Sequence, residues 1–336
     1  MNTRASKNGM KMSKSGMKAS KNSVKVSKRL EQIARAAGTA KLLADVGCDH
    51  GYTALWALQE GKAEHALCMD INPGPLSIAA ANMQKTGFSD RVSFLLSDGL
   101  RAAALPEEML FAGEREKRDA FFRKIEENRI TEIKITGTKA AELETVGIKA
   151  AGQSPGLRPN EIGFSGLCPD VIVISGMGGQ LITEILSLLP TNGAVCTEEM
   201  KQALLFAARD YLSGVHRLIL SPQSEPECVR AFLWEKLGFH IEEENMLYDE
   251  GKYYLILTAV PGREERYDPK DRQSAVHLRY GFRLFEKRDP VFHHYLEEEQ
   301  RKRNSILQTV SDSRRRAELT GEISGIEIFL KHWEEE

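Results

Sequence analysis

The stretch from Leu42 to Gly51 constrains the fold of this chain more than any other. It reads Leu-Leu-Ala-Asp-Val-Gly-Cys-Asp-His-Gly, an apolar strand that runs directly into a loop with glycines at 47 and 51. A helix-like segment, Tyr52 to Gly61, comes next. In an open parallel sheet ligands bind outside the carboxyl ends of the strands, and glycines let the backbone approach them closely. The stretch therefore predicts a nucleotide-binding turn.

Strands and helices alternate from Arg29 onward, which is typical of a parallel sheet with helical crossovers. The clearest helices are Pro73 to Thr86 and Glu225 to Leu237. The predicted strands are Lys41–Gly47, His65–Asp70, Arg91–Ser97, Asp170–Gly176 and Arg217–Gln223. Two further runs, Phe239–Tyr248 and Lys252–Val260, flank Asp-Glu-Gly and predict a hairpin. The expected fold is α/β: a Rossmann-like parallel sheet that ends in an antiparallel hairpin.

Composition divides the chain into a core domain, 29–262, and three other segments. Residues 1–28 are polar and repetitive, and we expect a disordered basic arm there. Residues 1–29 carry a net charge of +9. Because the whole chain has a net charge of −2, the remaining residues carry −11. Residues 104–168 interrupt the alternation and are interpreted as an insertion. Residues 263–336 show narrow apolar stripes over 269–288 and 291–333, which predict two antiparallel helices in a C-terminal hairpin or small coiled coil.

The five cysteines, at 48, 68, 168, 196 and 228, have no CxxC spacing. This pattern disfavours both a disulfide framework and a metal site. No apolar run approaches the roughly 20 residues that span a bilayer. A reducing cytoplasm is the expected location.

Carboxylates follow three successive predicted strands: Asp45 and Asp49 flank the first turn, Asp70 ends the second strand and Asp98 follows the third. A carboxylate at the end of the second strand can accept hydrogen bonds from ribose hydroxyls. The alternative is that Asp is simply common in turns. The first turn lacks G-x-G-x-x-G and is rich in acid, which suits a ligand with a positive centre, such as the sulfonium of S-adenosylmethionine.

A second glycine-rich loop, Ser175 to Gly179, ends the fourth strand just before a helix. It would let a flat substrate approach the methyl donor, although a plain tight turn is the alternative. The fifth strand ends in Ser221-Pro-Gln223, where an amide could contact a base edge.

Seven motifs together resemble the bacterial TrmK-type tRNA (adenine(22)-N(1))-methyltransferase family. They are Arg29-Leu30, Ala44 to Tyr52, Gly74-Pro75, Ser97 to Leu100, Ser175 to Gly179, Arg217 to Gln223 and Gly251 to Tyr254. The resemblance implies a class I methyltransferase fold that uses S-adenosyl-L-methionine to methylate N1 of adenine 22 in the tRNA D-arm. It also implies a C-terminal coiled-coil hairpin, tRNA binding and a role in tRNA processing.

The resemblance also assigns roles to residues, with Asp49 as the leading catalytic candidate. Cofactor-binding roles are expected for Asp45, Gly47, Cys48, His50, Gly51, Asp70, Ile71, Ser97, Asp98, Gly99, Ser175 and Gly176. Substrate-binding roles are expected for Arg29, Met177, Gly178, Gly179, Pro222 and Gln223. Three departures from the family pattern stand out: Cys48 replaces a serine, Ser175 replaces an alanine, and Ser221-Pro-Gln223 replaces Gln-Pro-Asn.

In the expected reaction the target adenine is unstacked into the pocket, because N1 is occupied in a duplex. Asp49 would hold or deprotonate the exocyclic amine; the alternative is that it merely caps the following helix. Candidate phosphate contacts are Arg29, Arg35, the basic arm and the cluster Arg279, Arg283, Lys287 and Arg288 beside Tyr280. A solvated surface is the alternative for that cluster.

Three other functions stay open at this point: a methyltransferase that acts on ribosomal RNA or protein, a catalytically silent RNA-binding module, and a nicotinamide dehydrogenase. The missing glycine pattern counts against the last of these. The expected partner is tRNA, with no membrane and no metal, and the chain is expected to act as a monomer.

Overall fold

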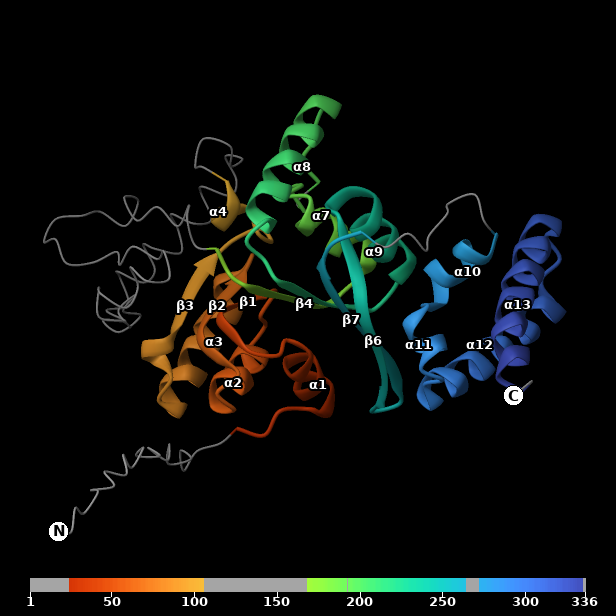
Figure 1. Cartoon of the computed structure of the whole chain (residues 1–336), viewed down its shortest axis with the longest axis horizontal. Coiled ribbons are helices and arrows are strands. Elements are labelled where there is room, and N and C mark those ends of the chain that lie inside the picture. The colour runs from red at the N-terminus through yellow and green to blue at the C-terminus, as the bar shows by residue number, and fades with distance from the viewer. Residues whose placement is uncertain (1–23, 106–167, 192, 264–271, 335–336) are drawn as a thin grey trace, which may run out of the picture.

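Seven strands form one sheet in the computed structural model, which describes residues 24–105, 168–191, 193–263 and 272–334. The strand order is β3-β2-β1-β4-β5-β7-β6. The strands are β1 (Ala40–Val46), β2 (Ala63–Asp70), β3 (Val92–Leu96), β4 (Val171–Met177), β5 (Arg217–Pro222), β6 (Phe239–Asp249) and β7 (Lys252–Pro261). The first five are parallel, and β7 pairs antiparallel with both β5 and β6. The predicted sheet with its terminal hairpin is confirmed (Figure 1).

Helices cover both faces of this sheet. They are α1 (Lys28–Ala36), α2 (Tyr52–Gln59), α3 (Pro73–Thr86), α4 (Arg101–Ala104), α7 (Gly179–Leu186), α8 (Glu198–Leu212) and α9 (Pro226–Phe232). A short 3₁₀ turn spans Ser89–Arg91, and a π-helical turn, Leu233–Leu237, extends α9. The predicted arm, 1–28, is described only from residue 24 on, and its end was placed too late, because Ser27 caps α1 and Lys28 begins it. The rest of the arm and nearly all of the predicted insertion, 104–168, fall outside the described residues.

The two faces carry separate cores because side chains of a strand alternate between them. In β1, Leu42 and Ala44 pack on the face covered by α4, α7, α8 and α9, whereas Leu43 packs on the face covered by α1, α2 and α3. Both faces of the sheet are therefore closed. The rim at the carboxyl ends of the parallel strands is where a ligand can enter.

The C-terminal region folds as four helices: α10 (Arg272–Tyr280), α11 (Arg283–Glu286), α12 (Pro290–Thr309) and α13 (Ser313–Glu334). We had expected two antiparallel helices, one over 269–288 and one over 291–333. The first stretch instead breaks at Gly281, whose φ is 98°, and the second folds back on itself after Thr309. The helical hairpin thus consists of α12 and α13, which pack along each other (Figure 1).

A buried ion pair fixes the start of this region to the sheet. Arg230 of α9 and Glu244 of β6 lie 2.7 Å apart, and their side chains are 0% and 1% exposed. Arg230 also donates to the carbonyl oxygen of Leu278, and Glu244 accepts from the backbone amide of Arg283. The pair therefore binds the end of α10 and the beginning of α11 to the core.

The predicted cationic cluster lies at this junction and is engaged within the molecule. Tyr280 is only 5% exposed and packs edge-on against Phe329, so it offers no ring to RNA. Arg279 pairs with Glu322, and Arg283 pairs with Glu286. Lys287 donates to the side-chain oxygen of Asn245 at 2.6 Å. Phosphate contact by the four cations stays a prediction, and the Tyr280 ring beside them is buried.

Candidate functional site

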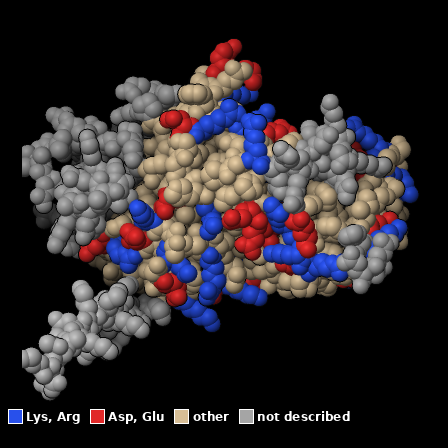
Figure 2. All heavy atoms as spheres, viewed as in Figure 1, with Lys and Arg blue, Asp and Glu red and all other residues tan. Residues whose placement is uncertain are grey.

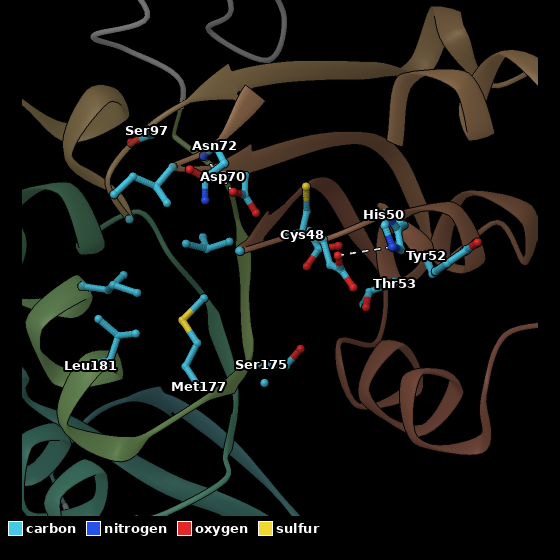
Figure 3. A pocket seen from close by; sticks show the side chains of 18 of the residues that line it. Cys48, His50, Tyr52, Thr53, Asp70, Asn72, Ser97, Ser175, Met177 and Leu181 are labelled. Atoms are coloured by element: carbon cyan, nitrogen blue, oxygen red, sulfur yellow. Dashed lines mark hydrogen bonds and ion pairs between the residues drawn. The ribbon is translucent and has the colours of Figure 1, made fainter. Parts of the chain in front are cut away.

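A cavity of about 520 Å³ opens at the carboxyl ends of the parallel strands (Figure 3). The predicted site residues that line it are Arg29, Asp45, Gly47, Cys48, Asp49, His50, Asp70, Ile71, Ser97, Asp98, Gly99, Ser175, Gly176, Met177 and Gln223. They come from segments up to 194 positions apart, the separation of Arg29 and Gln223. The structure therefore brings most of the predicted residues to one place.

Four predicted residues do not line the cavity. Gly51 is the left-handed N-cap of α2, and a Cβ there would lie 2.9 Å from that of Ala79. At Gly179 a Cβ would lie 2.2 Å from the carbonyl oxygen of Glu225, and Gly178 lies against the same turn. Pro222 is buried. These residues allow segments to pack closely, so for Gly178 and Gly179 the tight-turn alternative describes the structure better.

Asp45 is buried at the end of β1, with 2% of its surface exposed. Its carboxylate accepts a hydrogen bond from the amide of Ala54 in α2, at 3.3 Å. Burial, together with the nearby charges of Asp70 and Asp49, raises the pKa of Asp45 to about 7, although the Ala54 amide opposes the shift. A positive group in the cavity would favour the ionised form of this acid.

Asp49, by contrast, presents a free carboxylate. Its side chain is 76% exposed, and its contact is with Nε2 of His50 at 3.5 Å. The residue adopts a left-handed conformation, with φ of 50°, which is uncommon outside glycine, asparagine and aspartate. The N-cap of α2 is Gly51, and the Ala54 amide in the first turn of this helix donates to Asp45 rather than to Asp49. The alternative that Asp49 merely caps this helix is therefore wrong, and its acid remains available to a ligand.

Asp70 ends β2 and faces the cavity beside Asn72 (Figure 3). Its carboxylate accepts a hydrogen bond from the backbone amide of Asn72 at 2.8 Å. Partial burial raises the pKa of Asp70, and the amides of Asn72, Asp49 and Ile71 counteract this. A half-buried acid with some accepting capacity left suits the paired hydroxyls of a ribose.

Asp98 is 6% exposed and holds the loop after α7 in place. Both of its carboxylate oxygens accept hydrogen bonds from Thr191, one from the backbone amide at 2.9 Å and one from the hydroxyl. Sequence inspection missed Thr191, because no local motif marks a residue 93 positions away as a partner of Asp98. The other lining residues that it did not predict are Ser27, Leu30, Val46, Tyr52, Thr53, Asn72, Leu181 and Ile185.

Gly47 and Met177 approach each other closely in the lining of the cavity. Gly47 has φ of 68°, and a Cβ on it would lie 2.0 Å from the terminal methyl carbon of Met177. Figure 3 shows the Met177 side chain projecting into the cavity from the end of β4. The left-handed backbone therefore favours glycine at position 47, and a side chain there would also require the flexible end of Met177 to move.

Among the described residues, no group of three or more His, Cys, Asp and Glu side chains is arranged to hold a metal ion. Cys48 and Cys68 lie close together in the interior, and this contact and burial raise the pKa of the Cys48 thiol. Likewise, no helix in the described ranges is long and apolar enough to cross a membrane.

The sheet order and the acid-lined rim define a class I methyltransferase fold. A family model described as a methyltransferase domain matches residues 26–111, which include β1, β2 and β3. This segment carries all four of the cavity carboxylates, those of Asp45, Asp49, Asp70 and Asp98.

Within that class, a second family model, tRNA (adenine(22)-N(1))-methyltransferase, matches residues 199–328. A curated protein of that name from Bacillus subtilis (strain 168) is 24% identical over 241 residues, which are 71% of this chain and 67% of the relative. Both matches agree with the motif resemblance of this chain to the TrmK-type family.

Solved structures agree in fold. A putative tRNA (m1A22) methyltransferase from Streptococcus pneumoniae is 24% identical with a TM-score of 0.60, and the match covers 91% of this chain and all of that one. The same protein was also solved with S-adenosyl-L-methionine, with a TM-score of 0.58 to this chain. The B. subtilis enzyme TrmK is 23% identical with a TM-score of 0.58, and the match covers 92% and 100% of the two chains.

Proposed function

We propose that this protein is a tRNA methyltransferase that transfers the methyl group of S-adenosyl-L-methionine to N1 of adenine 22 in the D-arm. The observation that carries the proposal is the combination of a family model over 199–328 with an acid-lined cavity at the rim of a methyltransferase sheet. A tRNA substrate implies action in the cytoplasm, and we expect the protein to act as a monomer.

The cavity has the chemistry that the methyl donor requires. Four carboxylates, those of Asp45, Asp49, Asp70 and Asp98, line it, and the backbone at Gly47 can be approached closely. Asp70 would hold the ribose and Asp98 would lie at the adenine. When bound, S-adenosyl-L-methionine supplies a methyl group already activated by a positive sulfur, so correct placement provides most of the acceleration.

Asp49 is the residue that we assign to the target base. Its carboxylate is exposed at the cavity and unoccupied by the helix amides, so it can accept a hydrogen bond from the exocyclic amine of adenine. As a bond forms at N1 the ring becomes positive, and the carboxylate would stabilise that charge or take a proton from the amine. Ser175, Gly176 and Met177 would form the wall against which the base rests.

Nucleoside analysis after incubation with labelled S-adenosyl-L-methionine tests this function. Unmodified tRNA with adenine at position 22 should gain 1-methyladenosine, and the same tRNA with guanine at position 22 should gain none. Methylation of ribosomal RNA or protein instead would indicate another acceptor. If calorimetry detected tRNA binding but no binding of S-adenosyl-L-methionine, the protein would be a silent RNA-binding module.

A further inference from the structure

Arg29 is the one Lys or Arg among the residues that line the cavity, where it faces four aspartates. Other arginines of the described chain pair with carboxylates, as Arg35 does with Glu31 and Arg230 with Glu244. Arg29 has no such partner in the described ranges, and its Nε is buried without a hydrogen-bond acceptor. The guanidinium of Arg29 therefore keeps hydrogen-bond donors that no carboxylate of the described chain uses.

Contacts with the β6–β7 hairpin hold Arg29 in place. Its guanidinium carbon lies 4.9 Å from the centre of the Tyr254 ring, a cation–π geometry. Its backbone amide donates to a carboxylate oxygen of Asp249 at 3.3 Å. The negative charge of Asp249 beside the first turn of α1 also interacts favourably with the positive end of the helix dipole. The beginning of α1 is therefore anchored to the hairpin at two points.

The glycine loop gives the guanidinium access to the cavity. A Cβ on Gly176 would lie 3.2 Å from Nη2 of Arg29 and 3.9 Å from the side-chain nitrogen of Gln223. Arg29 thus lies at the wall shared by the first helix and the ends of β4 and β5. In the view of Figure 2, Lys and Arg are interspersed with Asp and Glu, without one continuous basic field.

We propose that Arg29 is the oxyanion-binding group of the cavity and that Tyr254 and Asp249 are its positioning residues. The inference rests on the proposed function, which supplies two oxyanions of the same chemistry: the amino-acid carboxylate of the methyl donor and a phosphate next to the target adenosine. A guanidinium can donate two parallel hydrogen bonds to either one.

Binding measurements on Arg29→Gln distinguish the two sources. If Arg29 binds the donor carboxylate, affinity for S-adenosylhomocysteine falls about tenfold, as expected for a charge-assisted pair. Affinity for 5′-methylthioadenosine, which lacks the carboxylate, stays the same. If Arg29 binds a phosphate, tRNA affinity falls instead, and the slope of log K against log salt decreases by about 0.9. Unchanged binding in both assays would overturn the inference.

Arg35→Gln is the matched control. Arg35 lies on the same helix, carries the same charge and also stacks on an aromatic ring, with its guanidinium carbon 5.1 Å from the Trp56 ring centre. It does not line the cavity. Its replacement should leave affinity for S-adenosylhomocysteine unchanged, and because Arg35 is itself a candidate phosphate contact, any loss of tRNA affinity should be smaller than that of Arg29→Gln. An equal loss in this variant would mean that the general charge of α1 is responsible, and the assignment to Arg29 would be wrong.

The positioning role is tested at Tyr254. Tyr254→Phe keeps the ring beneath the guanidinium, whereas Tyr254→Leu removes it. Whichever affinity Arg29→Gln lowers, Tyr254→Leu should also lower, to a smaller extent, whereas Tyr254→Phe should retain it. Equal affinities of the two Tyr254 variants would overturn the positioning role. Wild-type protein that binds neither S-adenosylhomocysteine nor tRNA would contradict the proposed function as well. Normal wild-type methylation with unchanged Arg29→Gln binding would contradict this inference alone.

Discussion

The carboxylate of Asp45 accepts a hydrogen bond from the amide of Ala54, and this contact separates the roles of the two acids in the first loop. The Asp45 carboxylate is buried beside the first turn of α2. Asp49, four positions later, is left exposed with only His50 beside it. The two residues look interchangeable in the sequence, yet only one of them can serve as a free acid at the cavity.

Replacement of Asp49 tests the catalytic assignment. Asp49→Asn keeps a residue type that tolerates a positive φ but removes the charge, so the fold should be retained. We expect kcat for tRNA methylation to fall by about 10² or more, because general acid–base groups contribute on that order. Affinity for S-adenosylhomocysteine, measured by calorimetry, should stay within about twofold. Near-normal kcat with unchanged cofactor affinity would refute the role.

The raised pKa of Asp45 predicts an unusual dependence of the free energy of unfolding on pH. The folded-state pKa of about 7 lies above the ordinary value of 3.8, so the folded chain holds a proton that the unfolded chain has already lost in this interval. The free energy of unfolding should therefore decrease as pH rises from about 4 to about 7.

Asp45→Asn separates this effect from other titrations. The amide keeps an oxygen for the Ala54 hydrogen bond and carries no charge. In urea denaturation without cofactor, the variant should exceed wild type by a few kcal/mol at pH 8, on the order expected for a shift of about three pKa units, and match it near pH 4. A stability difference that does not vary with pH would contradict the raised pKa.

A pair of glycine substitutions separates backbone strain from steric conflict. Gly61 and Gly47 both have positive φ, 65° and 68°, but a Cβ on Gly61 has no atom within 4 Å. Gly61→Ala should cost about 1–2 kcal/mol in unfolding free energy, the left-handed strain alone. Gly47→Ala also forces the flexible end of Met177 to move within the cavity, so it should cost at least as much as Gly61→Ala and should also weaken S-adenosylhomocysteine binding. Equal costs and intact binding would argue against a close approach of Gly47 and Met177 in the cavity lining.

The buried ion pair predicts a large stability effect. Arg230→Met leaves the Glu244 carboxylate buried without its partner and should cost about 3–5 kcal/mol in chemical unfolding. Lys201→Met, which breaks the exposed pair with Glu198, should have no measurable effect. Limited proteolysis should cut Arg230→Met earlier between α10 and α11, since both ends depend on this pair. Equal stabilities of the two variants would show that the buried pair does not anchor this region.

The sequence by itself determined the order of strands and helices, the terminal hairpin and the set of acids at strand ends. These features depend on local periodicity, on glycine and proline at segment ends, and on the rule that parallel strands end at one rim. For that reason most predicted site residues do lie around one cavity. The helix at Pro73–Thr86 was predicted with the bounds that the structure has, because Pro75 and Gly87 mark its ends.

Only the tertiary structure decided what each of these residues contacts. Thr191 donates hydrogen bonds to Asp98, and the turn at Ser224 and Glu225 packs against Gly179. The ring of Tyr254 makes a cation–π contact with the guanidinium of Arg29. Each contact joins segments tens to hundreds of positions apart. Hydrogen bonds and packing depend on distance in space, whereas the sequence of one chain records only distance along the chain. The contacts of each site residue therefore became visible only in the folded structure.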